Sequence, residues 1–132
     1  MQGDEVAGLL VGLARLALAA GAAISRHAHA PDASLKPDGS PVTLADAEAE
    51  AIILAGLAGL CPALPVIAEE DSARHGLRPV EGAFLLVDPL DGTREFIAGD
   101  GDYTVNIALI EAGADAILLE TFFINDCHWH FF

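Results

Sequence analysis

The sequence predicts a layered α+β protein in which two helices come first and the strands of a mixed sheet follow. Apolar residues with helical spacing fill two stretches of the first half, and four short apolar runs follow in the second half. Hydrophobic residues make up 53% of the 132 residues, which is enough for a core and argues against disorder. The predicted helices are too few to cover both faces of a sheet, so we expect an incomplete layer structure.

Two helices are expected before residue 62. One apolar stripe runs from Val6 to Ile24, and a second helix is predicted from Thr43 until Cys61 and the proline after it. Residues 31–42, which contain three prolines and a glycine, predict a polar loop between the helices. Thr43 and Asp46 have the spacing of a capping box, and capping alone would explain Asp46.

The second half predicts strands separated by turns. Residues 71–82 predict a loop, and residues 94–101 a helical turn followed by a loop. The last two strands are expected to pair as a hairpin around the turn at residues 112–113. The predicted strands are residues 65–69, 83–87, 103–111 and 116–124.

The net charge limits the kinds of molecule that the chain is expected to bind. Lys and Arg number 6 against 20 Asp and Glu, a formal net charge of −14, which argues against a nucleic acid polymer. A small phosphorylated substrate remains compatible if metal ions supply the positive charge.

The cysteines and the first apolar stretch indicate the cellular compartment. Cys61 and Cys127 imply no disulfide framework, so a reducing cytoplasm is the default expectation. Arg15 lies at the centre of the first apolar stretch, where a bilayer would penalise it, and acids rather than bases precede the stretch. We expect a buried helix, and peripheral contact with the inner membrane stays open.

The stretch from Leu85 to Phe96 carries the strongest chemical signal. An apolar run delivers Asp88 and Asp91 onto a predicted turn that contains Pro89 and Gly92. Hard carboxylate oxygens at the end of a strand suit magnesium. Each acid taken singly is more often an ordinary turn residue, but together they favour a metal-dependent reaction on a phosphate.

Two other groups of potential metal ligands lack the paired spacing of a zinc site. His27 and His29 are interpreted as residues at the end of the first helix. Cys127, His128 and His130 lie in an unusual C-terminal segment, and no role is assigned to them.

Three blocks of the chain resemble the inositol monophosphatase superfamily of metal-dependent phosphatases. They are residues 36–46, residues 68–71 with their acidic pair, and the signature-like Val87–Thr93. Residues 94–97 and 103–110 are most similar to the 3'(2'),5'-bisphosphate nucleotidase branch, CysQ. The resemblance covers roughly residues 5–113 and implies the N-terminal part of that family's αβαβα sandwich.

The resemblance implies Mg²⁺ as cofactor. Glu69, Asp88 and the Leu90 carbonyl would bind a first ion, and Asp88 would bridge to a second ion that Asp91 also binds. Family members continue for about as long again and supply a further aspartate to the second site.

The resemblance also implies roles in catalysis and substrate binding. Glu69 and Thr93 would orient the attacking water, and Asp46 would hold the Thr93 hydroxyl while still capping its helix. Asp91, Gly92 and Thr93 would contact the phosphate. The implied reaction is direct in-line hydrolysis of adenosine 3',5'-bisphosphate, a by-product of sulfur assimilation.

Two alternatives stay open. One is an inositol-1-phosphate phosphatase, against which residues 94–96 argue, and the other is a catalytically incomplete metal-binding fragment. We expect residues 1–113 to form the metal-binding part of the phosphatase domain and residues 114–132 an atypical C-terminal tail of a truncated chain. An unfinished sheet would also invite homo-oligomers.

Overall fold

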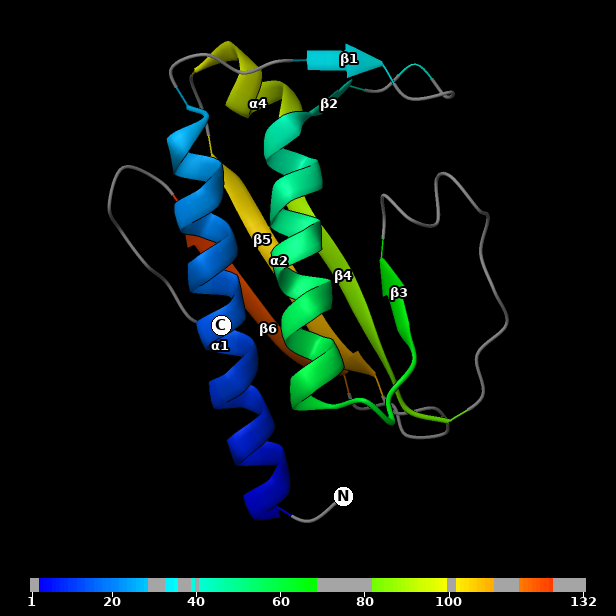
Figure 1. The fold of residues 1–132 in the computed structure, drawn as a ribbon. Coiled ribbons are helices and arrows are strands. Elements are labelled where there is room, and N and C mark those ends of the chain that lie inside the picture. Colours follow the sequence, from blue (N-terminus) through cyan, green and yellow to red (C-terminus); the bar gives the residue numbers. More distant parts are fainter. Residues whose placement is uncertain are drawn as a thin grey trace.

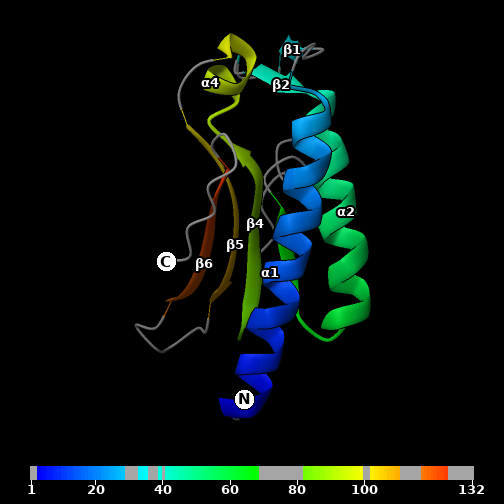
Figure 2. The ribbon, with the colours of Figure 1, turned by 90° about the vertical axis from the view of Figure 1, so that its left-hand side faces the viewer.

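Two long helices lie side by side on one face of a four-stranded sheet (Figure 1, Figure 2). The computed structural model describes residues 3–28, 33–35, 39, 41–68, 82–99, 102–110 and 117–124. The helices are α1 (Gly3–Arg26) and α2 (Leu44–Leu60), and a short helix, α4 (Thr93–Ala98), lies at one end of the sheet. The sheet contains β3 (Val66–Ala68), β4 (Phe84–Asp91), β5 (Tyr103–Ile110) and β6 (Ile117–Ile124), in that order.

Helix α1 is buried along one stripe, as predicted. The stripe has a spacing of three to four residues and contacts α2, β5 and β6. By length and composition α1 could cross a membrane, with a mean hydropathy of 1.9, but the core helix of a soluble protein passes the same test. Arg15 lies on its exposed side. The buried stripe includes Leu9, Leu13, Ala17, Ala20 and Ile24.

Glycines allow α1 and α2 to approach closely. A Cβ atom on Gly56 of α2 would lie 2.0 Å from Leu16 Cδ2 of α1. A Cβ atom on Gly12 of α1 would lie 2.6 Å from Leu60 Cδ2 of α2. Each helix therefore presents a glycine where the other presents a leucine, and the pair packs without space for a further methyl group.

The sheet is mixed, with β4 and β5 as its inner strands. β4 is parallel to β3 and antiparallel to β5, and β5 pairs antiparallel with β6 along its whole length. The hairpin predicted for residues 103–124 is confirmed. Whether a domain boundary falls at residue 113 stays a prediction, although β6 lies beyond it and completes the described sheet.

Both described long helices cover the same face of the sheet (Figure 2). Leu85 and Val87 of β4 and their partners Leu109 and Ile107 are buried beneath the helices. Alternation sends the intervening residues to the opposite face, where Leu86 is 42% exposed. The prediction of a layered α and β arrangement with helices too few for both faces is confirmed for the part of the chain that is described.

Two predictions were wrong in detail. The predicted loop at residues 31–42 contains two paired three-residue strands, β1 (Ala33–Leu35) and β2 (Pro41–Thr43). Strands this short give no periodic signal in the sequence. The strand predicted to end at Val87 continues to Asp91, because a register shift between Asp88 and Asp91 accommodates Pro89, which has no N–H for the ladder.

Candidate active site

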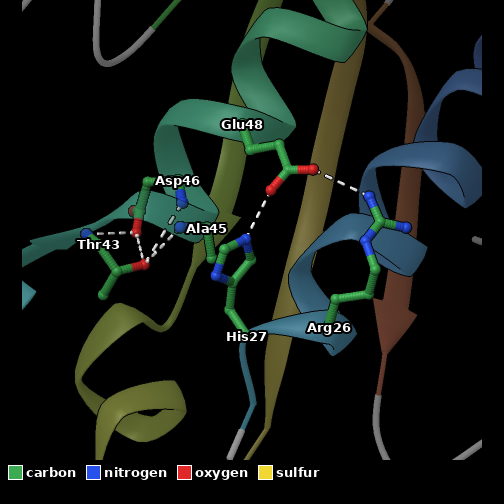
Figure 3. A network of polar contacts seen from close by, with 6 residues as sticks. All are labelled: Arg26, His27, Thr43, Ala45, Asp46 and Glu48. Carbon is green, nitrogen blue, oxygen red and sulfur yellow. Dashed lines mark hydrogen bonds and ion pairs between the residues drawn. The ribbon is translucent and has the colours of Figure 1, made fainter. Parts of the chain in front are cut away.

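The site begins at the N-terminus of α2, where Thr43 and Asp46 form the predicted capping box (Figure 3). The Thr43 hydroxyl accepts from the backbone N–H groups of Ala45 and Asp46, at 3.1 and 3.4 Å. Asp46 Oδ2 accepts from the Thr43 N–H at 2.8 Å and from the Thr43 hydroxyl at 2.7 Å. Asp46 is completely buried, so these hydrogen bonds offset the loss of its hydration.

The second oxygen of Asp46 contacts a different element. Asp46 Oδ1 accepts from the Thr93 hydroxyl at 3.1 Å, and the Leu90 carbonyl lies 3.2 Å from the same hydroxyl. A hydroxyl carries one proton, so it donates to one of these acceptors at a time. Asp46 therefore both caps α2 and contacts Thr93, which links the helix start to the end of β4. The contact expected from the resemblance is present.

The bulge in β4 places two carboxylates on one face of the sheet. Without it, Asp88 and Asp91 would point to opposite faces, since they are three residues apart. Asp88 pairs with Asn106 and Asp91 with Thr104, and these partners are two residues apart on β5. Both aspartates therefore lie on the face opposite α1 and α2, with Asp91 exposed and Asp88 half-buried.

Gly92 sets the geometry of the turn into α4. Its φ of +94° is left-handed, and a Cβ atom there would lie 2.8 Å from the Asp102 carbonyl oxygen. Any other residue would suffer both backbone strain and a clash with backbone. Gly92 thereby brings Thr93, the first residue of α4, into contact with Asp46.

The described oxygens fit a hard divalent cation. Two carboxylates share a face, and the Leu90 carbonyl lies between them in sequence and next to Thr93. Carboxylate and carbonyl oxygens are the ligands that Mg²⁺ takes. Glu69, the third predicted acid, lies outside the described residues, among which no group of three His, Cys, Asp or Glu side chains gathers around a point.

Two polar residues near the site were not predicted from the sequence. Glu50 is only 3% exposed and lies one helical turn after Asp46, a spacing of four that was visible in the sequence. Asn106 interrupts the apolar residues 105–110 of β5, and only the strand register shows that it lies opposite Asp88.

A polar network joins the end of α1 to the start of α2 (Figure 3). Glu48 accepts from the Arg26 guanidinium at 2.9 Å and lies 2.5 Å from His27 Nε2. Hydrogen bonding to His27, and then to Arg26, lowers the pKa of Glu48 below its usual value. His27 follows the last residue of α1, as its interpretation as a helix-end residue predicts, whereas His29 and residues 127–130 lie outside the described part.

Most of the chain matches a known protein family. A sequence profile of the inositol monophosphatase family matches residues 5–117. The 3'(2'),5'-bisphosphate nucleotidase CysQ of Salmonella typhimurium is 54% identical over 78 residues, which are 59% of this chain and 32% of that protein.

Solved structures give the same fold. CysQ from Bacteroides thetaiotaomicron, a bacterial member of the inositol monophosphatase family, superposes with a TM-score of 0.60 at 31% identity, over 92% of this chain and 47% of that chain. The extragenic suppressor protein suhB from Bartonella henselae superposes with a TM-score of 0.68 at 26% identity, over 92% and 51%. This chain thus spans about a third of the curated relative and half of the solved chains.

Proposed function

The chain belongs to the inositol monophosphatase family, and we propose that it is the N-terminal, metal-binding part of a magnesium-dependent 3'(2'),5'-bisphosphate nucleotidase. The favoured substrate is adenosine 3',5'-bisphosphate. The observation that carries the proposal is the contact of Asp46 with Thr93 and of Thr93 with Leu90, beside two aspartates on one sheet face. The similarity to CysQ supports the substrate class.

Four groups would hold the metal in this proposal. Glu69, Asp88 and the Leu90 carbonyl would bind one Mg²⁺, and Asp88 and Asp91 a second. When bound, Mg²⁺ supplies positive charge that stabilises the phosphate oxygens within a chain whose net charge is −14.

The chain's own residues would orient the water and the phosphate. When the Thr93 hydroxyl donates to Asp46, its lone pairs are left to accept a hydrogen bond from a water molecule, which Glu69 would also contact. Asp91, Gly92 and Thr93 would meet the phosphate. The water oxygen then bonds to phosphorus on the face opposite the ester oxygen and gives up a proton. The ester P–O bond breaks, and the leaving sugar oxygen takes up a proton to become a hydroxyl, so that protons balance.

Two alternatives rest on the comparisons. An inositol monophosphatase from Zymomonas mobilis is 30% identical to this chain, so inositol 1-phosphate is the competing substrate. Since the chain spans only part of its relatives, a metal-binding segment that needs the remaining length for turnover is the other alternative. In either case the cytoplasm stays the expected compartment, and homo-oligomer formation through the open sheet face stays a prediction for size-exclusion chromatography.

Phosphate release tests the proposal. We expect magnesium-dependent release from adenosine 3',5'-bisphosphate that exceeds release from inositol 1-phosphate and is lost in Asp91→Asn. Asp4→Asn, which makes the same charge change in the exposed first turn of α1, is the matched control. Thr93→Ala should lower kcat more than it raises KM, and Thr93→Ser should retain most of the rate.

The outcomes separate the alternatives. Equal turnover in Asp91→Asn and in Asp4→Asn would contradict the metal assignment. Faster release from inositol 1-phosphate would replace the substrate. If neither substrate is hydrolysed although the chain binds Mn²⁺, the segment alone is not a working enzyme.

A further inference from the structure

Asn106 lies opposite one proposed metal-binding aspartate and donates a hydrogen bond to the other. It pairs directly with Asp88 across the β4–β5 ladder, and the bulge brings Asp91 opposite Thr104, two residues away on the same face. Asn106 Nδ2 lies 3.1 Å from Thr104 Oγ1 and 3.5 Å from Asp91 Oδ2. Both hydrogen bonds come from Nδ2. One of its hydrogens points to the hydroxyl oxygen of the buried Thr104, and the other points to the exposed carboxylate of Asp91.

The orientation of this amide follows from its neighbours. A carboxylate accepts hydrogen bonds and donates none, so the NH₂ group and not the carbonyl oxygen must face Asp91. This orientation leaves Asn106 Oδ1 buried, with no hydrogen-bond partner among the described residues. Burying an acceptor without a hydrogen-bond partner is destabilising, so stability does not explain an asparagine at this position.

An amide is suited to positioning a carboxylate that must also bind a cation. Lysine or arginine would hold Asp91 more strongly, but its charge would repel the metal. Asn106 donates a hydrogen bond and adds no charge. The arrangement resembles the groups behind metal ligands in general, whose role is to fix the direction of the ligating oxygen.

We propose that Asn106 is a positioning residue that orients Asp91 for a divalent cation. The inference rests on the proposed function, because it takes Asp91 as a metal ligand. It predicts that Asn106 affects metal affinity through Asp91 alone, and that it contributes little to the stability of the fold.

Mn²⁺ binding followed by electron paramagnetic resonance tests the proposal without relying on activity. Asn106→Leu keeps the approximate size of the side chain and removes the donor. We expect its dissociation constant for Mn²⁺ to rise about tenfold, the lower end of the effect of such residues, because the bond to Asp91 is long. The midpoint of thermal unfolding should change little, since the lost hydrogen bond to Thr104 is offset by removal of the buried carbonyl oxygen.

A double-mutant cycle with Asp91→Asn separates positioning from a general structural effect. If Asn106 acts through Asp91, Asn106→Leu should have no further effect on Mn²⁺ affinity in the Asp91→Asn background. The same weakening in both backgrounds, or none in either, would overturn the inference while the metal site stands. Failure of the unsubstituted chain to bind Mn²⁺ would overturn the inference and the proposed metal site together.

Discussion

The α1–α2 helix pair and the end of β4 achieve close packing in opposite ways. Between the helices, Gly12 and Gly56 leave space that leucines of the opposite helix fill. At the end of β4, a hydrogen bond joins Thr93 to Asp46, whose carboxylate is completely buried. Glycine is required at residue 92 because backbone atoms, and not only side chains, lie close to it.

The comparison predicts different consequences of substitution. In the helix pair, shape is limiting, so an added side chain should lower stability without affecting the chemistry of the site. At the end of β4, the directions of the side-chain oxygens are what matters. A small displacement there should weaken metal binding and turnover strongly, even where it lowers the stability of the fold only a little. Each region can be tested by one substitution at the constrained glycine and a second at a glycine that has open space around it.

Gly56→Leu should lower stability and leave the site unchanged. Its side chain would occupy the position of Leu16, because a Cβ atom alone already lies 2.0 Å from Leu16 Cδ2. Overpacking of this kind costs about 1–3 kcal/mol. Urea unfolding should show that loss, while Mn²⁺ affinity of the folded fraction stays close to that of the unsubstituted chain.

Gly59→Leu is the matched control on the same helix. A Cβ atom at Gly59 meets nothing within 4 Å, and replacing glycine in a helix gains up to about 1 kcal/mol in propensity. Stability should therefore hold or rise. Equal losses at both positions would mean that the close approach of α1 and α2 is not what limits substitution.

Gly92→Ala should lower stability by a comparable amount and should have a larger effect on the site. The left-handed φ of Gly92 costs about 1–2 kcal/mol for a residue with a Cβ atom, and the contact with Asp102 adds to this cost. Gly99→Ala is the control, since Gly99 is also left-handed but has open space around its Cβ position. Thermal unfolding should rank Gly99→Ala between the unsubstituted chain and Gly92→Ala.

Mn²⁺ affinity should distinguish the two glycine variants more clearly. Relief of the clash at residue 92 must move either the start of β5 or Thr93, whereas alanine at residue 99 lies at the far end of α4. Only Gly92→Ala should weaken binding. Equal affinities in the two variants would show that the position of the β4–α4 turn does not control the site.

The sequence was sufficient for elements with a local signal. Apolar periodicity located both long helices, and the capping spacing of Thr43 and Asp46 located the start of α2. The pattern of residues 85–96 singled out Asp88 and Asp91, and the resemblance added Thr93; their roles stay predictions. The neighbouring residues in the sequence do not show whether Asp46 caps the helix or contacts the site. It does both, because Oδ2 accepts from the Thr43 N–H and Oδ1 accepts from the Thr93 hydroxyl.

Apart from Glu50, whose spacing from Asp46 was visible in the sequence, the features that were missed depend on pairing between strands. Pro89 and Gly92 are typical of a turn, yet β4 continues as a strand because β5 pairs with it around a bulge. Asn106 has no local signature, since its role depends on the residue opposite. Glu69 and residues 127–130 lie outside the described part, so their assignments stay predictions.

Glu48→Gln should have the smallest effect, and its dependence on pH is the informative part. Hydrogen bonds from His27 and Arg26 lower the pKa of Glu48 from its ordinary value of 4.5. A depressed folded-state pKa stabilises the folded chain above pH 4.5, and this contribution disappears as the pH falls through the lower, folded-state pKa. Arg26 and Glu48 are 62% and 40% exposed, so solvent weakens the pair.

Urea unfolding at several pH values measures this contribution. The unsubstituted chain should be slightly more stable than Glu48→Gln at pH 7, and the difference should shrink as the solution is acidified below pH 4.5. Glu95→Gln, on the exposed surface of α4, is the control for removing one negative charge from a chain of net charge −14. A difference that is constant from pH 7 to pH 3 would show that Glu48 joins the two helices through packing and not through its charge.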